Sequence, residues 1–93
     1  MFIVQELQTS AEGNVAFLPP ITQEDANKAE SEFYIKVGYA AISSVWRHTI
    51  MLFSEDGAMY KFKCYQHDVN GTQVLIDHDT DLPREEPEPE PEE

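Results

Sequence analysis

Basic residues are scarce in this chain. It has 93 residues, of which 6 are Lys or Arg and 18 are Asp or Glu, so its formal net charge is -12 and its pI is near 4.4. Proteins that bind nucleic acids neutralise several phosphates with cationic side chains, so this balance argues against a nucleic-acid-binding protein. Lys61 and Lys63, with Arg47 across a predicted hairpin, form at most a basic spot for one phosphate of a nucleotide.

Cysteine and glycine are also rare. With Cys64 as its single cysteine, the chain forms no intramolecular disulfide and carries no Cys/His set with zinc-binding spacing. Its four glycines stand alone, so there is no glycine-rich phosphate loop. Residues 77–81, DHDTD, alternate oxygen and nitrogen donors but lack the glycine and terminal glutamate of a calcium loop. We therefore expect no metal ion and no cofactor.

Long apolar runs are missing as well. None approaches the roughly 18 to 20 residues of a membrane-spanning helix, and the N-terminus, MFIVQELQTS, lacks the basic flank and long apolar stretch of a secretory signal. These features predict a cytoplasmic protein, in which a single free thiol stays reduced.

The charge is concentrated at the C-terminal end. Residues 79–93, DTDLPREEPEPEPEE, contain four prolines and a single apolar residue, Leu82, so we expect them not to pack. The sequence predicts one α+β domain at residues 1–78 and a disordered acidic tail at residues 79–93. The tail is either a solubilising segment or an acidic ligand for a basic partner.

Periodicity and turn residues predict the elements of the domain. Thr22 is a good N-cap for a helix, and Gly13, Asn14 and the pair Asn70-Gly71 favour tight reversals between strands. Pro19 and Pro20 end the second strand because proline donates no ladder hydrogen bond. The pattern predicts one amphipathic helix on a small antiparallel sheet in the order ββαβββ, with strands at residues 2–9, 15–18, 45–53, 58–67 and 73–76 and the helix at residues 23–42.

The predicted helix is apolar on two sides. One stripe, expected to lie on the sheet, comprises Ala26, Ala29, Phe33, Val37, Ala40 and Ala41. Ile35, Tyr39 and Ile42 lie roughly opposite, and a helix on one small sheet buries only one of these faces. We interpret these three residues as a patch for a partner or a second copy, with Gly38 marking a close backbone approach. The alternative is a tolerated Gly38 with Tyr39 flat on the surface.

In the predicted hairpin of residues 45–53 and 58–67, side chains alternate between two faces, and neither face is entirely polar. Lys61, Lys63 and Tyr65 share one face of its second strand, and Tyr60, Phe62 and Cys64 share the other. In the first strand the two sets are Trp46, His48, Ile50 and Leu52 against Arg47, Thr49, Met51 and Phe53. The sequence leaves open which side faces the helix.

No catalytic constellation emerges from the titratable residues. His48 lies in the middle of a predicted strand, where a ring with one satisfied hydrogen bond is the usual structural role. Cys64 and His67 are three residues apart, so in a strand they lie on opposite faces and do not form a nucleophile–base pair. A possible ligand surface, at the seam of a dimer, comprises Trp46, His48, Tyr60 and Lys61.

Several short segments carry a family resemblance. FIVQELQT, NKAESEFY, AAISSV with a nearby histidine, IMLFSEDG and YQH, within residues 2–67, resemble small uncharacterised proteins encoded by bacteriophages and integrated elements of anaerobic gut Firmicutes. The resemblance implies a phage or mobile-element gene product acting in a host cytoplasm. It implies no activity and no functional residues.

Charge, apolar surface and this resemblance together favour a non-enzymatic interaction protein. The expected form is an acidic homodimer that covers a basic site on a host protein, as an anti-defence inhibitor does, with Glu24, Asp25, Glu55 and Asp56 contributing electrostatic field. One alternative is a small structural or morphogenesis protein of the virion. A second alternative is a nucleotide-sequestering protein with its pocket at the dimer seam.

Overall fold

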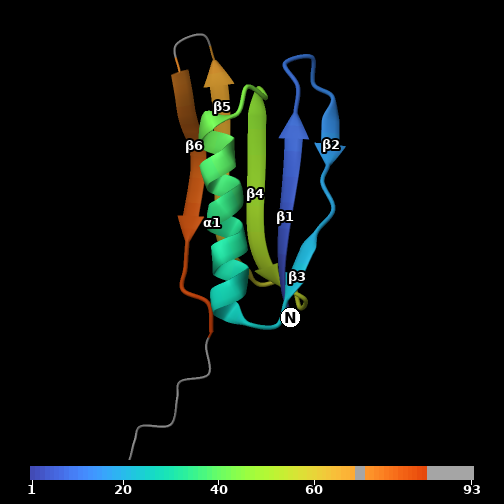
Figure 1. The fold of residues 1–93 in the computed structure, drawn as a ribbon, viewed down its shortest axis with the longest axis vertical. Coiled ribbons are helices and arrows are strands. Elements are labelled where there is room, and N and C mark those ends of the chain that lie inside the picture. The colour runs from blue at the N-terminus through green and yellow to red at the C-terminus, as the bar shows by residue number, and fades with distance from the viewer. Residues whose placement is uncertain (69–70, 84–93) are drawn as a thin grey trace, which may run out of the picture.

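The computed structural model describes residues 1–68 and 71–83, and only the backbone of residues 68 and 71–76. It confirms an α+β fold in which one helix packs on an antiparallel sheet (Figure 1). The elements in chain order are β1 (Phe2–Thr9), β2 (Val15–Phe17), β3 (Ile21–Gln23), α1 (Ala26–Ile42), β4 (Arg47–Ser54), β5 (Met59–Asp68) and β6 (Gly71–Asp79).

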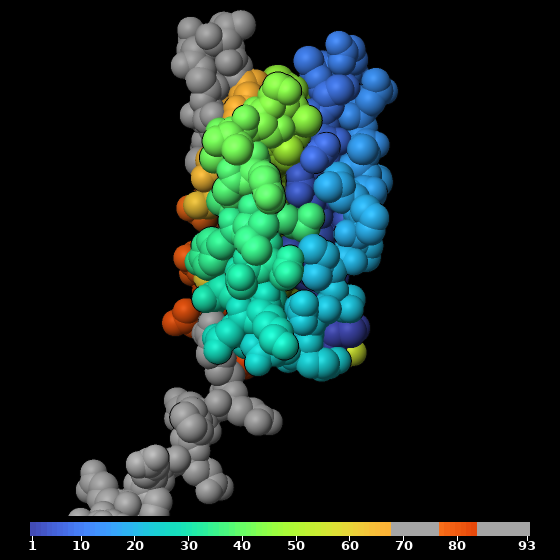
Figure 2. Space-filling model, in the orientation of Figure 1, coloured from blue at the N-terminus to red at the C-terminus, as the bar shows by residue number. Residues whose placement is uncertain are grey.

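The sheet has the strand order β2-β1-β4-β5-β6, and every pairing is antiparallel. The short strands β2 and β3 pair with opposite ends of β1. They therefore share one edge of this long strand, and β4 pairs with its other edge. Helix α1 runs along one face of this sheet, beside the β1–β2 hairpin (Figure 2). The molecule therefore has two layers, with the sheet covered on one side.

The helix begins three residues later than the sequence predicts. Thr22 is not its N-cap: it lies in β3, where it pairs with Ile3. Asp25 caps the helix instead, because its carboxylate accepts the backbone N–H of Lys28 at 2.9 Å. A third N-terminal strand, β3, is thus added to the predicted element order.

The core lies between the helix and the sheet. Val4, Ile50 and Leu52 from the central strands are fully buried there. The helix contributes the buried residues Ala29, Phe33 and Ala40, which confirms the predicted sheet-facing stripe except at Ala41, which is exposed. A 3.6-residue period places Ala41 beyond the edge of the stripe that Ala29, Phe33 and Ala40 define.

Strand register decides which side of the second hairpin faces the helix. Lys61 pairs with Leu52 and Lys63 pairs with Ile50, so the lysine-bearing side of β5 lies under the helix. Because side chains alternate between the two faces of a strand, Met51, Phe53 and Phe62 lie on the opposite side of the sheet.

The turns follow the glycines. Gly13 and Gly57 have positive φ angles of 91° and 93°; the first confirms the predicted reversal after β1, and the second makes the turn between β4 and β5. Asn14 does not share this conformation: among the described residues only glycines have positive φ. β5 and β6 form the predicted hairpin, with Asp68 paired to Gly71, whereas Asn70 lies outside the described residues. β6 is longer at both ends than the predicted strand at residues 73–76.

Packing continues beyond the predicted domain boundary at residue 78. β6 extends to Asp79, and Leu82 is only 4% exposed because it joins the core under the helix. The expectation that this segment does not pack is therefore wrong at Leu82. Burial of this leucine side chain contributes about 1.5–3 kcal/mol toward ordering Thr80 and Asp81, the two residues that separate it from β6.

Leu82→Ala tests this contribution. We expect it to lower the free energy of unfolding by about 2–3 kcal/mol, because it removes buried methyl groups and leaves a cavity. Urea denaturation monitored by circular dichroism measures the change. Asp81→Ala, at the exposed neighbouring position, should change stability by less than about 0.5 kcal/mol. Equal effects of the two variants would contradict the burial of Leu82.

Candidate functional site

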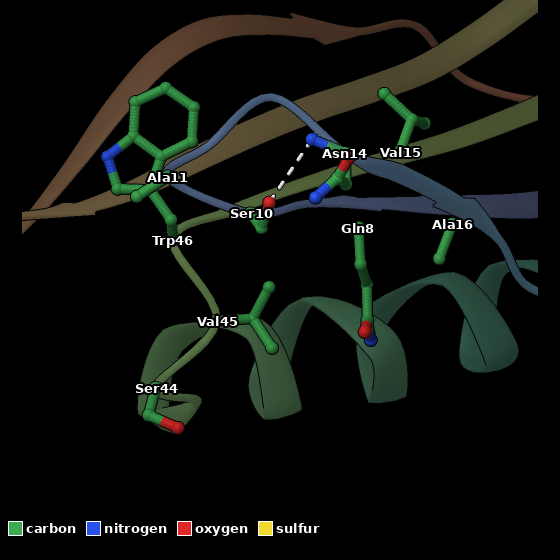
Figure 3. Close-up of a pocket in the computed structure, with 9 residues that line it drawn as sticks. All are labelled: Gln8, Ser10, Ala11, Asn14, Val15, Ala16, Ser44, Val45 and Trp46. Atoms are coloured by element: carbon green, nitrogen blue, oxygen red, sulfur yellow. Dashed lines mark hydrogen bonds between the residues drawn. The ribbon is translucent and has the colours of Figure 1, made fainter.

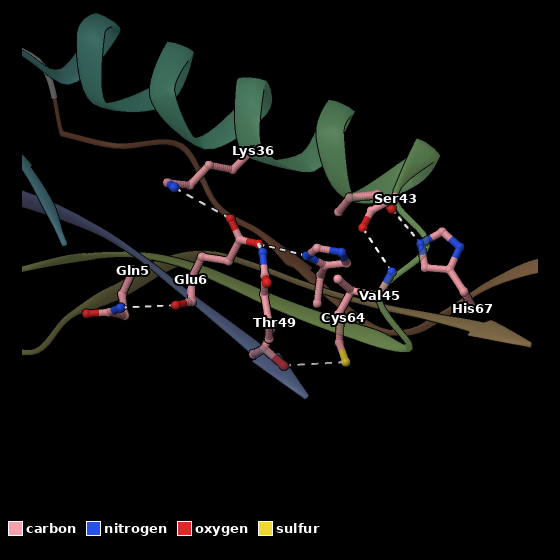
Figure 4. Close-up of polar contacts among 11 residues, drawn as sticks. Gln5, Glu6, Lys36, Ser43, Val45, Thr49, Cys64 and His67 are labelled. Carbon is pink, nitrogen blue, oxygen red and sulfur yellow. Dashed lines mark hydrogen bonds and ion pairs between the residues drawn. The ribbon is translucent and has the colours of Figure 1, made fainter. Parts of the chain in front are cut away.

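A polar cluster lies buried between the helix and the sheet (Figure 4). His48 on β4 directs its Nδ1 to Oε2 of Glu6 on β1 at 2.7 Å. The same oxygen accepts a hydrogen bond from Gln8 Nε2 at 3.0 Å, and Lys36 of the helix places its Nζ 3.5 Å from the other carboxylate oxygen. The register makes this meeting possible, because His48 pairs with Gln8 and both side chains point to the helix side of the sheet.

The cluster confirms the structural interpretation of His48. The ring is 2% exposed and has one partnered nitrogen, while its Nε2 has no hydrogen-bond partner. A carboxylate only accepts hydrogen bonds, so Nδ1 carries a proton toward Glu6. A general base must lie within hydrogen-bond reach of the proton that it abstracts from a substrate. The buried imidazole of His48 is not accessible to a substrate in this way. The pair therefore holds β1, β4 and the helix together.

The other nucleophile and ligand candidates are dispersed. Thr49 Oγ1 contacts Cys64 Sγ at 3.8 Å on the face away from the helix, whereas His67 Nε2 lies against the carbonyl oxygen of Ala40 at the end of the helix. Cys64 and His67 thus lie on opposite faces, as predicted. Within residues 1–68 and 71–83, no three His, Cys, Asp or Glu side chains are arranged to hold a metal ion.

Lys61 is a buried cation held by acidic partners. Its Nζ forms an ion pair with Asp79 and lies 3.8 Å from Glu30 of the helix. Burial alone would lower the pKa of this ammonium group, but interactions with Asp79 and Tyr34 outweigh burial, and the pKa is raised above its usual value of 10.5. Lys61 therefore stays protonated and paired, and it is not presented to a ligand.

The predicted ligand surface is not assembled. Trp46 and His48 lie near the start of β4, whereas Tyr60 and Lys61 lie opposite its other end, where Lys61 pairs with Leu52. Leu52 is four positions beyond His48 along β4, a distance of about 13 Å. His48 and Lys61 are also buried. These four side chains do not form one surface in the protomer.

A pocket of about 510 Å³ lies between the β1–β2 hairpin and the connection from the helix to β4 (Figure 3). Trp46 lines it, and sequence reasoning missed the other lining residues because they come from two segments far apart in the chain. No charged side chain lines this pocket, so it offers amide and hydroxyl groups but no counter-ion for a phosphate. The lining residues are Gln8, Ser10, Ala11, Asn14, Val15, Ala16, Ser44, Val45 and Trp46.

The outer side of the helix carries the predicted apolar patch. Ile35, Tyr39 and Ile42 are exposed, with Tyr39 at 68% and Ile42 at 82%. Tyr34 is also exposed, but at about 100° per residue it lies on another side of the helix, where its ring faces Lys61 Nζ at 5.4 Å. Apart from the adjoining residues of the helix itself, no described atom lies within 4 Å of the position that a Cβ would take at Gly38. We call Ile35, Tyr39 and Ile42 the helix patch.

Acidic side chains dominate the exposed charge. Of the described lysines and arginines only Lys28 is exposed, and Lys36, Lys61 and Lys63 each pair with carboxylates. Exposed acidic side chains stand at one end of the sheet, on the β3–α1 link and the β4–β5 turn: Glu24, Asp25, Glu55 and Asp56.

The N-terminal amino group joins the two acidic segments. The Met1 nitrogen lies 3.1 Å from Glu55 Oε1 and 3.6 Å from Glu24 Oε2. The hydrogen bond to Glu55 raises the pKa of this amino group, and Glu24 adds to the effect. In the neighbouring turn, a hydrogen bond from the Ser54 hydroxyl lowers the pKa of Asp56. The Asp56 carboxylate therefore remains ionised at neutral pH.

No family model, curated protein or solved structure matches this chain. Among the described residues, no helix has the length and apolar character needed to cross a membrane.

Glu6→Ala tests the buried cluster. We expect the free energy of unfolding to fall by about 2–4 kcal/mol, because the change leaves His48 Nδ1 and the Gln8 amide buried without an acceptor. Chemical denaturation measures the loss. Glu12→Ala, on an exposed turn, is the matched control and should change stability by less than about 0.5 kcal/mol. A loss no larger for Glu6 than for Glu12 would show that the cluster contributes nothing.

The raised pKa of Lys61 predicts an alkaline pH dependence. A group whose pKa is raised on folding stabilises the fold below its unfolded pKa and loses that contribution as the pH rises through its folded value. The difference in free energy of unfolding between the wild type and Lys61→Met should therefore be constant from pH 7 to about pH 9. Above about pH 10.4 the wild type should lose stability relative to the variant. Urea denaturation across this range measures it, and a constant difference throughout would contradict the pairing.

Proposed function

We propose that this chain is a non-enzymatic interaction protein that binds a basic partner protein through the helix patch. The observation that carries the proposal is the exposure of three large apolar side chains along one side of the helix, on a protein whose exposed charge is mainly acidic. Single exposed apolar residues are common on protein surfaces, whereas an apolar stripe at successive helical turns is typical of a contact surface.

The composition of the helix patch suits a binding role. Tyrosine is enriched at the energetic centre of protein interfaces because its ring buries a large area and its hydroxyl still finds a hydrogen bond. Tyr39 would supply this anchor, and Ile35 and Ile42 would supply the surrounding apolar area. The open space at Gly38 leaves room for a partner's backbone to approach the helix.

The acidic surface supports a basic partner. Glu24, Asp25, Glu55 and Asp56 carry charge that attracts a basic protein over a distance of about 10 Å at ordinary salt. Such charges accelerate association and select the partner more than they add affinity. The resemblance to phage and mobile-element proteins would make this partner a host protein, in which a basic channel for nucleic acid is the kind of site that an acidic inhibitor covers.

The geometry gives the nucleotide-binding alternative less support. Trp46, His48, Tyr60 and Lys61 are divided between two ends of the sheet, and the pocket beside Trp46 has no cationic lining residue. The burial of His48 likewise favours a non-enzymatic role. A structural role in a virion remains the second candidate, because the helix patch would serve assembly equally well.

Affinity capture with tagged full-length protein tests the proposal. We expect one basic protein from a bacterial lysate to be retained at low salt and lost at high salt, because electrostatic attraction between exposed charges is screened. Tyr39→Asp should abolish retention, since it places a charge in the apolar contact. Mass spectrometry identifies the retained protein.

The control is Ala11→Asp, which adds the same charge at an exposed residue of the pocket rim. It should retain the partner. If Ala11→Asp abolishes capture and Tyr39→Asp does not, the partner binds at the pocket. If the eluate contains a small molecule that absorbs ultraviolet light and no protein, the nucleotide alternative is supported instead. Recovery of the chain in purified phage particles would favour the structural role.

A further inference from the structure

The side of the sheet turned away from the helix carries large apolar side chains on four strands. Ile3 pairs with Phe53, Leu7 pairs with Phe17, and Met51 pairs with Phe62. Directly paired residues lie on the same side of a sheet, and successive residues of a strand alternate between the two sides. The buried residues Val4 and Leu52 point to the helix, so these six point away from it. We call Ile3, Leu7, Phe17, Met51, Phe53 and Phe62 the open face.

No element within residues 1–68 and 71–83 covers the open face. The helix contacts the strands on the other side (Figure 1), and Leu82 belongs to the core cluster that the helix covers. Phe17 is 74% exposed, and Met59, which pairs with Phe53, is also exposed. The other members of the open face are only half-buried. A protein of this size with so much apolar surface on one sheet face has an incompletely covered core.

We propose that a second copy of this chain covers the open face. The two sheets would pack face to face, as the sheets of a β-sandwich do, with a helix on each outer side. This inference does not depend on the proposed function, because it concerns the other layer of the molecule and leaves the helix patch free for a partner.

The area of the open face is near what a stable dimer requires. The open face spans four strands, which at a spacing of about 4.8 Å make it about 19 Å wide, and eight residues at about 3.3 Å each make it about 26 Å long. The footprint is therefore roughly 500 Å² per protomer before side-chain relief is counted. Specific protein interfaces bury about 600–1,000 Å² per partner, so this one face comes close to the lower end of that range.

Charge selects the second copy over other occupants. Among the strand residues whose side chains are described and point away from the helix, Arg47 is the only Lys, Arg, Asp or Glu, although the chain has 18 acidic residues. A basic partner would find no carboxylate there, and an anionic membrane would be repelled by the acidic protein as a whole. A second copy brings an apolar face of the same shape, while the acidic ends stay in solvent.

A two-fold dimer would bring the centre of one open face against the centre of the other. In a two-fold dimer the same patch serves both subunits, so the large side chains of one open face must fit beside those of the other. Met51 lies at the centre of the face, next to Gln5 on one side and Phe62 on the other. Its flexible thioether chain adapts to an opposing surface, which suits a central contact.

Sedimentation equilibrium of the full-length chain tests the inference. At micromolar concentrations we expect a particle of twice the 10.6 kDa chain mass, which persists at high salt because the contact is apolar. Met51→Lys should weaken the dimer by at least about tenfold, since it buries a charge at the centre of the contact. Phe17→Asp should also weaken it, and because Phe17 is already exposed, this variant preserves the fold. Circular dichroism confirms that each variant is folded.

Ile42→Asp is the matched control, because it adds a charge at an exposed apolar residue of the opposite layer. It should leave the dimer intact. A wild type that is monomeric at all concentrations would overturn the inference. So would a dimer that Ile42→Asp dissociates while Met51→Lys and Phe17→Asp do not, because the helix patch would then be the seam. Binding of the monomer to neutral lipid vesicles, lost in Met51→Lys, would instead assign the open face to a membrane.

Failure of this inference and failure of the proposed function give different results. The dimer is measured with the pure chain and responds to Phe17 and Met51, whereas partner capture responds to Tyr39. A monomer that still captures a basic protein through Tyr39 would refute the dimer and keep the proposed function.

Discussion

A single helix covers only one face of a sheet, and this constraint shapes the whole molecule. Helix α1 has 17 residues, and it packs over β1 and β4 with its buried residues Ala29, Phe33 and Ala40. The sheet that it covers is five strands wide along its main path. The chain is therefore left with an apolar sheet face on one side and an apolar helix stripe on the other. Both surfaces follow from having one helix for one broad sheet.

Charged and polar side chains lie on the covered side of the sheet, where apolar side chains are usually expected. The covered side of the sheet holds Glu6, His48 and Lys61, all nearly fully buried, whereas the uncovered side is mainly apolar. Burying these groups is tolerable because each has a partner of opposite charge or a hydrogen bond at hand. Ion pairs from Lys36 and Lys61 to residues of other elements also fix how the helix sits on the sheet. An uncovered apolar face remains available for association.

Much of the fold could be predicted from the sequence, because its signals are local. Alternation along β4 and β5, the helical period of residues 26–42 and the glycines at 13 and 57 each reflect short-range geometry. The errors arise where tertiary pairing overrides a local signal. Thr22 is a good N-cap, but ladder pairing with Ile3 places it in a strand and leaves the cap to Asp25. Leu82 looks isolated among prolines and acids, yet the helix provides a site for it.

The candidate sites divide in the same way. Exposure of Ile35, Tyr39 and Ile42 follows from helical spacing alone, so the sequence predicts it correctly. The grouping of Trp46, His48, Tyr60 and Lys61 failed because it required knowledge of strand register and of which side faces the helix. Side-chain alternation allows either face of a strand to point toward the helix, and hydrophobicity alone would place Lys61 and Lys63 in solvent. These two lysines instead lie on the helix side, where they form ion pairs with Glu30, Asp77 and Asp79.

The central claim is that the uncovered sheet face makes the contact between two chains. Isotope-filtered nuclear Overhauser spectroscopy on a mixture of labelled and unlabelled protein tests it most directly, because only contacts between different chains give signals. The account predicts cross-peaks from the Met51 methyl group to aromatic protons of Phe53, Phe62 or Phe17 in the other chain. Intermolecular cross-peaks confined to Ile42 and Tyr39, or none at concentrations where the protein sediments as a dimer, would contradict it.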